Sequence, residues 1–267
     1  MRFTNIMAGL ASACVWGEVH GQHNYSDINP FIVGGTVAKH TYPWVGATRF
    51  DLNGETQCGS SLIAEKWVLL AAHCYVWVLK PDYVVFGEYE TGKTNNAHYL
   101  VRRVKRIIKH PNYNKPTKSS NDIALLELET PVKSITPVNI KDAAKYEQDG
   151  TETELVGWGR LSEKGSVSKK LMHVVLPTVD NKKCILPSAV KGRLQDTNIC
   201  AGYKEGGKDA CAGDSGGPLF FTPTGKAPVQ TGLVSWGVGC ARPNSMGVYT
   251  RVSSYIAWIE KTIGEKL

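Results

Sequence analysis

The 267-residue sequence lacks any apolar run long enough for a transmembrane helix, which needs about 20 such residues. It also lacks internal repeats and low-complexity linkers, and its composition excludes disordered and fibrous proteins. Neither a Cys-x-x-Cys nor a His-x-x-x-His spacing occurs anywhere, so zinc binding is disfavoured. We therefore expect a folded chain with no membrane partner, no metal and no cofactor.

Glycine accounts for 27 residues, which indicates many turns and therefore many short strands. From residue 32 onward, short apolar runs alternate with glycine, proline and asparagine clusters, a pattern typical of an all-β sandwich or barrel. The clearest runs are Ser61–Ile63, Trp67–Leu70, Tyr83–Phe86, Ile123–Leu126 and Gly232–Trp236.

One helix is expected, at the C-terminal end of the sequence. Ile256, Ile259 and Ile263 recur at helical spacing, and Ser253 and Ser254 are suitable caps for its first turn. The polar stretch from Asp142 to Thr153 is the best candidate for a crossing between two halves of the fold.

Residues 1–17 have the pattern of a secretory signal peptide, with Arg2 ahead of the apolar run from Ile6 to Ala13. A poorly ordered N-terminus is the alternative. Export would favour disulfides among the six cysteines that follow Cys14, and six cysteines allow 15 pairings. They are Cys58, Cys74, Cys184, Cys200, Cys211 and Cys240.

The segment Gly213–Pro218, Gly-Asp-Ser-Gly-Gly-Pro, carries a candidate nucleophile in Ser215. It fits the Gly-x-Ser-x-Gly turn of α/β-hydrolases, in which the catalytic histidine follows the serine. No histidine follows Ser215 in this sequence. The α/β-hydrolase interpretation therefore fails.

A serine hydroxyl becomes a good nucleophile only when a base removes its proton and an acid orients that base. His73 in Ala-Ala-His-Cys directly follows the apolar run Trp67–Leu70. Asp122 leads into the run Ile123–Leu126, where a buried acid would require a partner. Taken singly, each residue also fits a structural histidine or a solvated turn acid.

In chain order, His73, Asp122 and Ser215, together with Ile32-Val33-Gly34-Gly35, resemble the trypsin-like branch of the chymotrypsin family of serine proteases. The resemblance extends from Ile32 to the C-terminal helix. It implies an all-β fold of two six-stranded antiparallel barrels with a terminal helix.

The resemblance also implies where these parts begin and end. The first barrel would span about 32–141, the second about 154–252 and the helix 253–266, all within a protease domain of residues 32–267.

The resemblance also implies a mechanism without a cofactor. Ser215 attacks the peptide carbonyl, His73 transfers the proton, Asp122 orients His73, and the N–H groups of Gly213 and Ser215 form the oxyanion hole. The implied disulfides are Cys58–Cys74, Cys184–Cys200 and Cys211–Cys240.

By the same resemblance, Asp209 corresponds to the acid at the base of the primary pocket and would bind substrate arginine or lysine. A solvated loop acid beside Lys208 is the alternative. Gly237 and Gly247 correspond to the pocket walls. Ala210 offers no hydroxyl to an ammonium group, so we expect arginine to be preferred.

The segment Ser235-Trp236-Gly237 corresponds to the strand that pairs with the substrate backbone, and the Ser235 hydroxyl to a group that contacts Asp122. The amine of Ile32, freed by cleavage, would pair with Asp214 after residues 18–31 are removed as a propeptide. Phe31 departs from the Arg or Lys usual at that bond, so we expect a different protease to cut there. Protein substrates, this activating protease and protein inhibitors are the expected partners, in the extracellular space.

Two further features leave alternatives open. The basic stretch 102–109 could bind a polyanion, although a solvated strand face is favoured and no nucleic-acid partner is expected. Glu88 is retained where trypsin has a calcium loop, but the later acids are missing, so a tight calcium site is not expected.

The competing functional class is a protease-like protein that binds a partner without cleaving it. This class is disfavoured because no member of the triad is lost.

Overall fold

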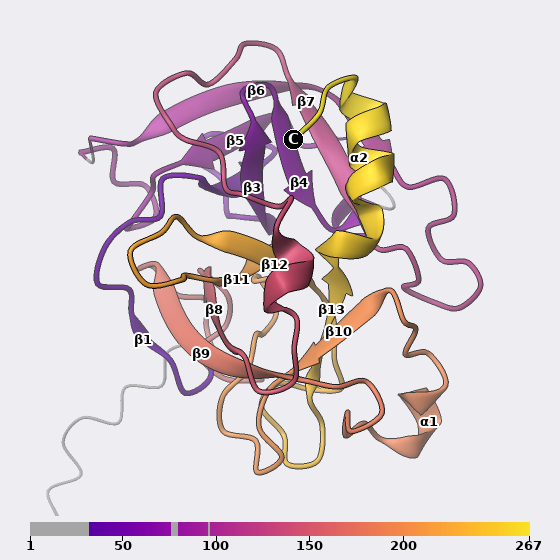
Figure 1. Cartoon of the computed structure of the whole chain (residues 1–267). Coiled ribbons are helices and arrows are strands. Elements are labelled where there is room, and N and C mark those ends of the chain that lie inside the picture. The colour runs from indigo at the N-terminus through magenta and orange to yellow at the C-terminus, as the bar shows by residue number, and fades with distance from the viewer. Residues whose placement is uncertain (1–31, 76–79, 96) are drawn as a thin grey trace, which may run out of the picture.

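The computed structural model describes residues 32–75, 80–95 and 97–267, and Figure 1 shows their arrangement. The expected signal peptide (1–17), the expected propeptide (18–31) and Cys14 lie outside the described residues. Two groups of strands stacked one above the other make up most of the fold. Within the described ranges, every helix is too short or too polar to span a lipid bilayer.

The first six-stranded group closes into an antiparallel barrel in the order β2-β3-β4-β7-β6-β5. All residues of β4 and β7 are buried, which explains why these strands read as apolar runs in the sequence. The strands are β2 (Val45–Arg49), β3 (Cys58–Ala64), β4 (Trp67–Leu70), β5 (Tyr83–Phe86), β6 (Leu100–Lys109) and β7 (Ala124–Leu128).

The second group closes in the order β8-β9-β10-β13-β12-β11, because β8 pairs with both β11 and β9. Strand β9 alternates buried and half-buried residues, the two-residue period of a sheet with one face in a core. A short strand, β1 (Thr36–Val37), pairs with Met172 and His173 at the start of β9. The six barrel strands are β8 (Glu152–Gly157), β9 (Met172–Val179), β10 (Asn198–Ala201), β11 (Pro218–Phe221), β12 (Val229–Trp236) and β13 (Gly247–Arg251).

The expected fold of two six-stranded antiparallel barrels is confirmed. Aromatic and polar contacts join the barrels, with the Trp44 and Phe220 rings edge to face at 5.1 Å. The Ser61 hydroxyl also donates to Gln230 Oε1 at 2.6 Å, and both side chains are buried. Two barrels packed on a shared core provide a rigid seam on which a site can be built.

The crossing between the barrels differs from the one expected at Asp142 to Thr153. It runs from residue 129 to 151 and includes a short 3₁₀ turn, η2 (Ala143–Tyr146). Thr153 already belongs to β8, where it pairs with Leu176. Polarity alone therefore placed both the start and the end of the crossing too late.

The C-terminal helix is present, but it is shorter than expected. A 3₁₀ turn, η3 (Val252–Tyr255), leads into α2 (Ile256–Ile263), which ends at Gly264 in the left-handed conformation, φ 77°. Ser253 does not cap the helix, because its hydroxyl donates instead to Glu147 Oε2 at 2.8 Å. The three isoleucines of α2 pack against the core that extends into the first barrel. Figure 1 shows the helix beside that barrel.

Candidate active site

His73 and Asp122 come together because their strands are neighbours. His73 lies in a 3₁₀ turn, η1 (Ala72–Tyr75), just after β4, and Asp122 lies just before β7. Strands β4 and β7 are antiparallel, with Leu70 opposite Ala124, so both residues emerge at one end of the first barrel. The backbone N–H of His73 donates to Asp122 Oδ1 at 2.8 Å, and Nδ1 lies 2.7 Å from Oδ2.

The Asp122 carboxylate is held by both barrels. It is 1% exposed, and the Ser235 hydroxyl, at the end of β12, donates to Oδ2 at 2.5 Å. The Thr250 hydroxyl, on β13, donates to the Asp122 carbonyl at 2.8 Å. An aspartate fixed in this way orients the histidine ring and leaves its Nε2 facing away from the carboxylate.

The protonation of His73 follows from this environment. Burial by itself lowers the pKa of His73, but the hydrogen bond to Asp122 and its negative charge outweigh burial and raise the pKa above the ordinary value. The side chain remains 27% exposed, so the ring can exchange protons with a bound molecule. His73 can therefore accept a proton as a base and then donate it as an acid.

Ser215 precedes β11 and lies between the two barrels, and the next residue, Gly216, lies close to Cys74. Its carbonyl accepts a hydrogen bond from Gly59 N at 2.8 Å, and Gly216 N donates to Val234 O at 2.9 Å. A Cβ on Gly216 would lie 3.1 Å from Cys74 Sγ, one residue after His73. No hydrogen bond joins Ser215 Oγ to His73 in the described part of the chain, and such bonds often tighten only when substrate is bound.

The backbone around Ser215 presents two unused donors. Within the described residues, the N–H groups of Gly213 and Ser215 have no protein acceptor, whereas the N–H of the intervening Asp214 donates to Cys211 O. Gly213 has φ +102°, and a Cβ there would lie 3.0 Å from Gly159 Cα. Only glycine adopts this conformation without strain, and the turn leaves two donors for a developing oxyanion.

A cavity of about 130 Å³ opens beside Ser215. Asp209 lines it and is 6% exposed, so it is not the solvated loop acid of the alternative interpretation. Its Oδ2 accepts from Ala241 N at 2.9 Å, and no basic side chain among the described residues forms an ion pair with it. Burial raises the pKa of Asp209 to about 7, although the N–H groups of Ala241 and Ala210 lower it in part.

The other expected pocket residues also line this cavity. A Cβ on Gly247 would lie 2.8 Å from Asp209 Oδ1, so any side chain there would cover the carboxylate. At Gly237 the nearest atom to such a Cβ is 3.7 Å away, so a side chain would have room to extend. Ala210, Ser235 and Trp236 complete the set, and Asp209 is the one acidic side chain among the lining residues that the structure describes.

Ile32 and Asp214 lie in the interior of the second barrel and its adjoining loops. Ile32 is completely buried in a core that includes Leu155 and Ile199. Asp214 is 1% exposed, and its carboxylate accepts from Gly159 N at 2.8 Å and Cys211 N at 3.0 Å. These N–H groups lower its pKa only in part, and burial raises it to about 6.

All three expected disulfides are confirmed: Cys58–Cys74, Cys184–Cys200 and Cys211–Cys240. The first joins β3 to the turn that carries His73, and the third joins two cysteines that line the pocket. Cys58, His73 and Cys74 lie within metal-binding range of one another. Their two sulfurs are consumed by the disulfide, so the thiolates that a metal would need are not available.

Two contacts near the site were missed at the sequence level. The Arg193 guanidinium carbon lies 4.3 Å from the centre of the Trp236 ring, and Thr250 supports Asp122. Neither Arg193 nor Thr250 belongs to a motif, so no local pattern could have identified them. A third contact, the buried ion pair between Arg49 and Glu88 at 2.5 Å, lies in the loop region compared above with a calcium site.

The basic stretch 102–109 lies along β6, and part of its charge is already used. Lys105 and Arg106 both pair with Glu127, at 2.8 and 2.5 Å. The Lys109 ammonium donates to the Tyr75 carbonyl at 2.6 Å. These contacts agree with the favoured interpretation of a strand face rather than a surface reserved for a polyanion.

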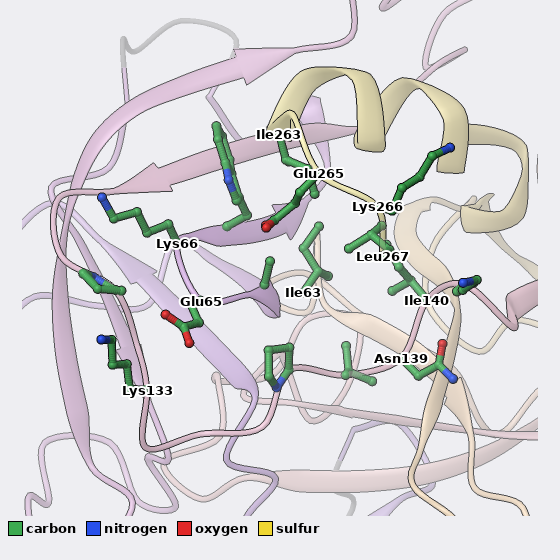
Figure 2. Close-up of a pocket in the computed structure, with 16 residues that line it drawn as sticks. Ile63, Glu65, Lys66, Lys133, Asn139, Ile140, Ile263, Glu265, Lys266 and Leu267 are labelled. Atoms are coloured by element: carbon green, nitrogen blue, oxygen red, sulfur yellow. The ribbon is translucent and has the colours of Figure 1, made fainter.

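A larger cavity, of about 840 Å³, lies between the C-terminal tail and the start of β4, away from the candidate catalytic residues (Figure 2). Lys66, Lys133 and Lys266 line it together with Glu65 and Glu265. It contains none of His73, Asp122 and Ser215. Its size therefore does not make it the catalytic site, and the smaller cavity beside Ser215 remains the candidate.

A comparison with known families agrees with this geometry. A family model described as Trypsin matches residues 32–259, which include every residue discussed in the site. The match covers most of the chain and both barrels. The chain therefore belongs to the trypsin family and is a serine protease.

Proposed function

We propose that the protein is a secreted endopeptidase that cuts after arginine, and less readily after lysine, and that it is made as a precursor activated by cleavage before Ile32. The observation that carries the specificity is Asp209, a buried carboxylate in the cavity beside Ser215 that pairs with no cation among the described residues. A buried carboxylate that lacks a counter-charge is costly, and a substrate cation would remove that cost.

In the proposed reaction, Ser215 Oγ attacks the carbonyl carbon of the scissile bond and its proton passes to His73 Nε2. The N–H groups of Gly213 and Ser215 stabilise the oxyanion. His73 then donates the proton to the leaving amine as the C–N bond breaks, which leaves an acyl-enzyme. Water attacks the ester, gives a proton to His73 and releases the acid, while His73 returns the proton to Ser215.

The preference for arginine rests on Ala210. A guanidinium can bind the Asp209 carboxylate with two parallel hydrogen bonds, whereas an ammonium is a point charge that needs more partners around it. The methyl group of Ala210 offers none. The backbone of the substrate would pair with Ser235–Gly237 as an added strand, which positions the scissile bond over Ser215.

Peptides that differ only in arginine, lysine or glutamine before the cut test this proposal. We expect kcat/KM to fall in that order for the activated enzyme, and Ser215→Ala to remove the burst of product. In Asp209→Ser, the advantage of arginine over glutamine should disappear while the burst remains. Equal turnover of matched lysine and arginine peptides would contradict the arginine preference.

Activation is proposed to depend on Ile32 and Asp214. The amine released by cleavage after Phe31 would pair with the buried Asp214 and order the neighbouring oxyanion loop. Ile32 is already buried, and Val33 O accepts from Asp209 N at 3.1 Å, so this segment is coupled to the pocket. Phe31 fits a protease that prefers aromatic residues rather than the enzyme itself.

Purified precursor tests the activation step. We expect it to remain inactive alone and to become active when a chymotrypsin-like protease exposes Ile32, as read by N-terminal sequencing. Phe31→Arg should make the precursor activate itself, and the same variant with Ser215→Ala should not. Prompt self-cleavage of the unmodified precursor would argue against a separate activator. Recovery of the protein from the culture medium without residues 1–17 tests secretion.

A further inference from the structure

Arg193 lies beside the candidate active site without belonging to it. It follows the short helix α1 (Ser188–Lys191), and its guanidinium carbon is 4.3 Å from the centre of the Trp236 ring. Nη2 donates to the Ser119 hydroxyl at 3.2 Å, in the loop before Asp122. Trp236 lines the cavity that contains Asp209, so Arg193 is separated from that cavity by one side chain.

The positive charge of Arg193 is not neutralised. No carboxylate within the described ranges pairs with it, and its Nε is buried without a hydrogen-bond partner. A guanidinium stacked on an aromatic ring uses its face, so its N–H groups point outward in the plane of the group. Since Nη2 already donates once to Ser119 and Nε is buried, Nη1 and the second N–H of Nη2 are the donors left for an anion such as a carboxylate.

The proposed substrate path brings an acidic side chain within reach of these donors. A substrate strand paired with Ser235–Gly237 advances about 3.3 Å per residue away from Ser215. The residue in the Asp209 cavity is the first before the cut, so the third or fourth residue before the cut passes Trp236. A glutamate or aspartate there could approach the edge of the Arg193 guanidinium.

We propose that Arg193 is a specificity-determining residue that selects substrates with glutamate or aspartate three or four residues before the scissile bond. This inference rests on the proposed function, since it assumes cleavage after arginine. It combines two requirements of opposite sign, a cation for Asp209 and an anion for Arg193. The substrate class is therefore an acidic segment that ends in arginine.

Fluorogenic peptides ending in arginine test the proposal in the activated enzyme. Glutamate and glutamine are compared in turn at the second, third and fourth residues before the cut. We expect glutamate to raise kcat/KM by about three- to tenfold at the third or fourth residue, chiefly through a lower KM, and not at the second. Added salt should reduce this ratio, because the pair is partly exposed.

Variants distinguish selection from a structural role. In Arg193→Gln the ratio of glutamate to glutamine should fall to about one, while cleavage of the glutamine peptide continues. Arg193→Lys should keep part of the ratio, because the charge remains but the fork is lost. Lys191→Gln, which removes the same charge from the exposed face of α1, should leave the ratio unchanged.

Two outcomes would overturn the proposal. One is a ratio near one in the unmodified enzyme at every position. The other is a ratio that survives in Arg193→Gln, even if that variant melts at a lower temperature because the Ser119 contact is lost. Failure of the proposed function looks different, since no arginine peptide of the series would then be cleaved.

Discussion

The buried carboxylates of the two barrels have different kinds of partner. In the first barrel, Glu88 pairs with Arg49 at 2.5 Å and Asp122 with His73 at 2.7 Å, so each acid has a partner in the same barrel. In the second, Asp209 and Asp214 accept only hydrogen bonds from backbone N–H groups among the described residues. Burial raises the pKa of both, to about 7 and about 6.

This difference shows that the two barrels contribute different parts of the candidate site. The first barrel provides both members of the acid–base pair, and Ser235 and Thr250 of the second barrel support Asp122 by hydrogen bonds. The second holds two carboxylates whose cations would come from elsewhere, one from the substrate and one from a new N-terminus. Unpaired buried charge is costly, so we expect the second barrel to gain stability from binding and activation.

The largest expected effect concerns the acid of the first barrel. Asp122→Asn should lower kcat/KM by about four orders of magnitude, the loss typical of this triad, because the amide cannot hold His73 in the same tautomer. Steady-state kinetics on an arginine peptide measures it. Binding of benzamidine, a small amidinium ion that should need only Asp209, should remain unchanged. A comparable loss of benzamidine binding would show that the two barrels do not act separately.

The next effect concerns the buried ion pair between Arg49 and Glu88 in the first barrel. Arg49→Met leaves Glu88 buried without its cation and should lower the free energy of unfolding by about 3–5 kcal/mol. Urea denaturation measures the loss. Combining Arg49→Met with Glu88→Gln should recover most of it, because the amide oxygen can still accept the Gly92 N–H bond. A double variant no more stable than the single one would mean that the charge of Glu88 is not the cause.

Substitution of Asp214 is expected to raise the free energy of unfolding of the precursor, whereas Arg49→Met lowers that of the protein. Its folded pKa, about 6, lies above the ordinary value of 3.8. Between about pH 4 and 6 the folded chain keeps a proton that the unfolded chain has lost, so stability falls as pH rises through this range. Asp214→Asn should therefore stabilise the precursor by about 1–2 kcal/mol at pH 8, less than the full linkage because one acceptor is lost, and by almost nothing at pH 4.

Thermal unfolding at both pH values measures this gain, with Ser215→Ala in both proteins to prevent self-digestion. After activation the same substitution should abolish activity, because the new amine would have no carboxylate to meet. A precursor that Asp214→Asn destabilises at pH 8 would remove the contrast between the barrels.

The smallest effect is the pH dependence of the pocket. With a pKa of about 7, Asp209 is largely neutral at pH 6 and largely ionised at pH 8. Benzamidine should therefore bind about tenfold more tightly at pH 8 than at pH 6. Titration calorimetry measures the two affinities, and Asp209→Asn should give a flat and weak profile. A flat profile in the unmodified protein would place the pKa of Asp209 well below 6.

Much of this could be predicted from short stretches of sequence. The apolar run Trp67–Leu70 forms β4 because four successive buried residues suit a strand packed on both faces. The helix at 256–263 followed from three isoleucines, but its start was misjudged at Ser253. A serine can cap a helix or bind a distant acid, and only the position of Glu147 decides between these roles.

The remaining contacts join residues far apart in the sequence, which is why they were missed. Arg49 and Glu88 are 39 residues apart, and the sequence around either residue does not predict that they pair. Arg193 meets Trp236 only because α1 packs beside the end of β12, against a cluster that includes Cys184 and Cys200. Such pairs depend on strand order and loop paths, which local patterns do not contain.

The sequence alone determined the strand-rich fold, the chain order of His73, Asp122 and Ser215, and the family, because these depend on local patterns and short motifs. The tertiary structure alone decided which carboxylates are paired and which are not. Burial and the distance to a cation set the state of a charged group, and both quantities exist only when the two barrels are closed and packed.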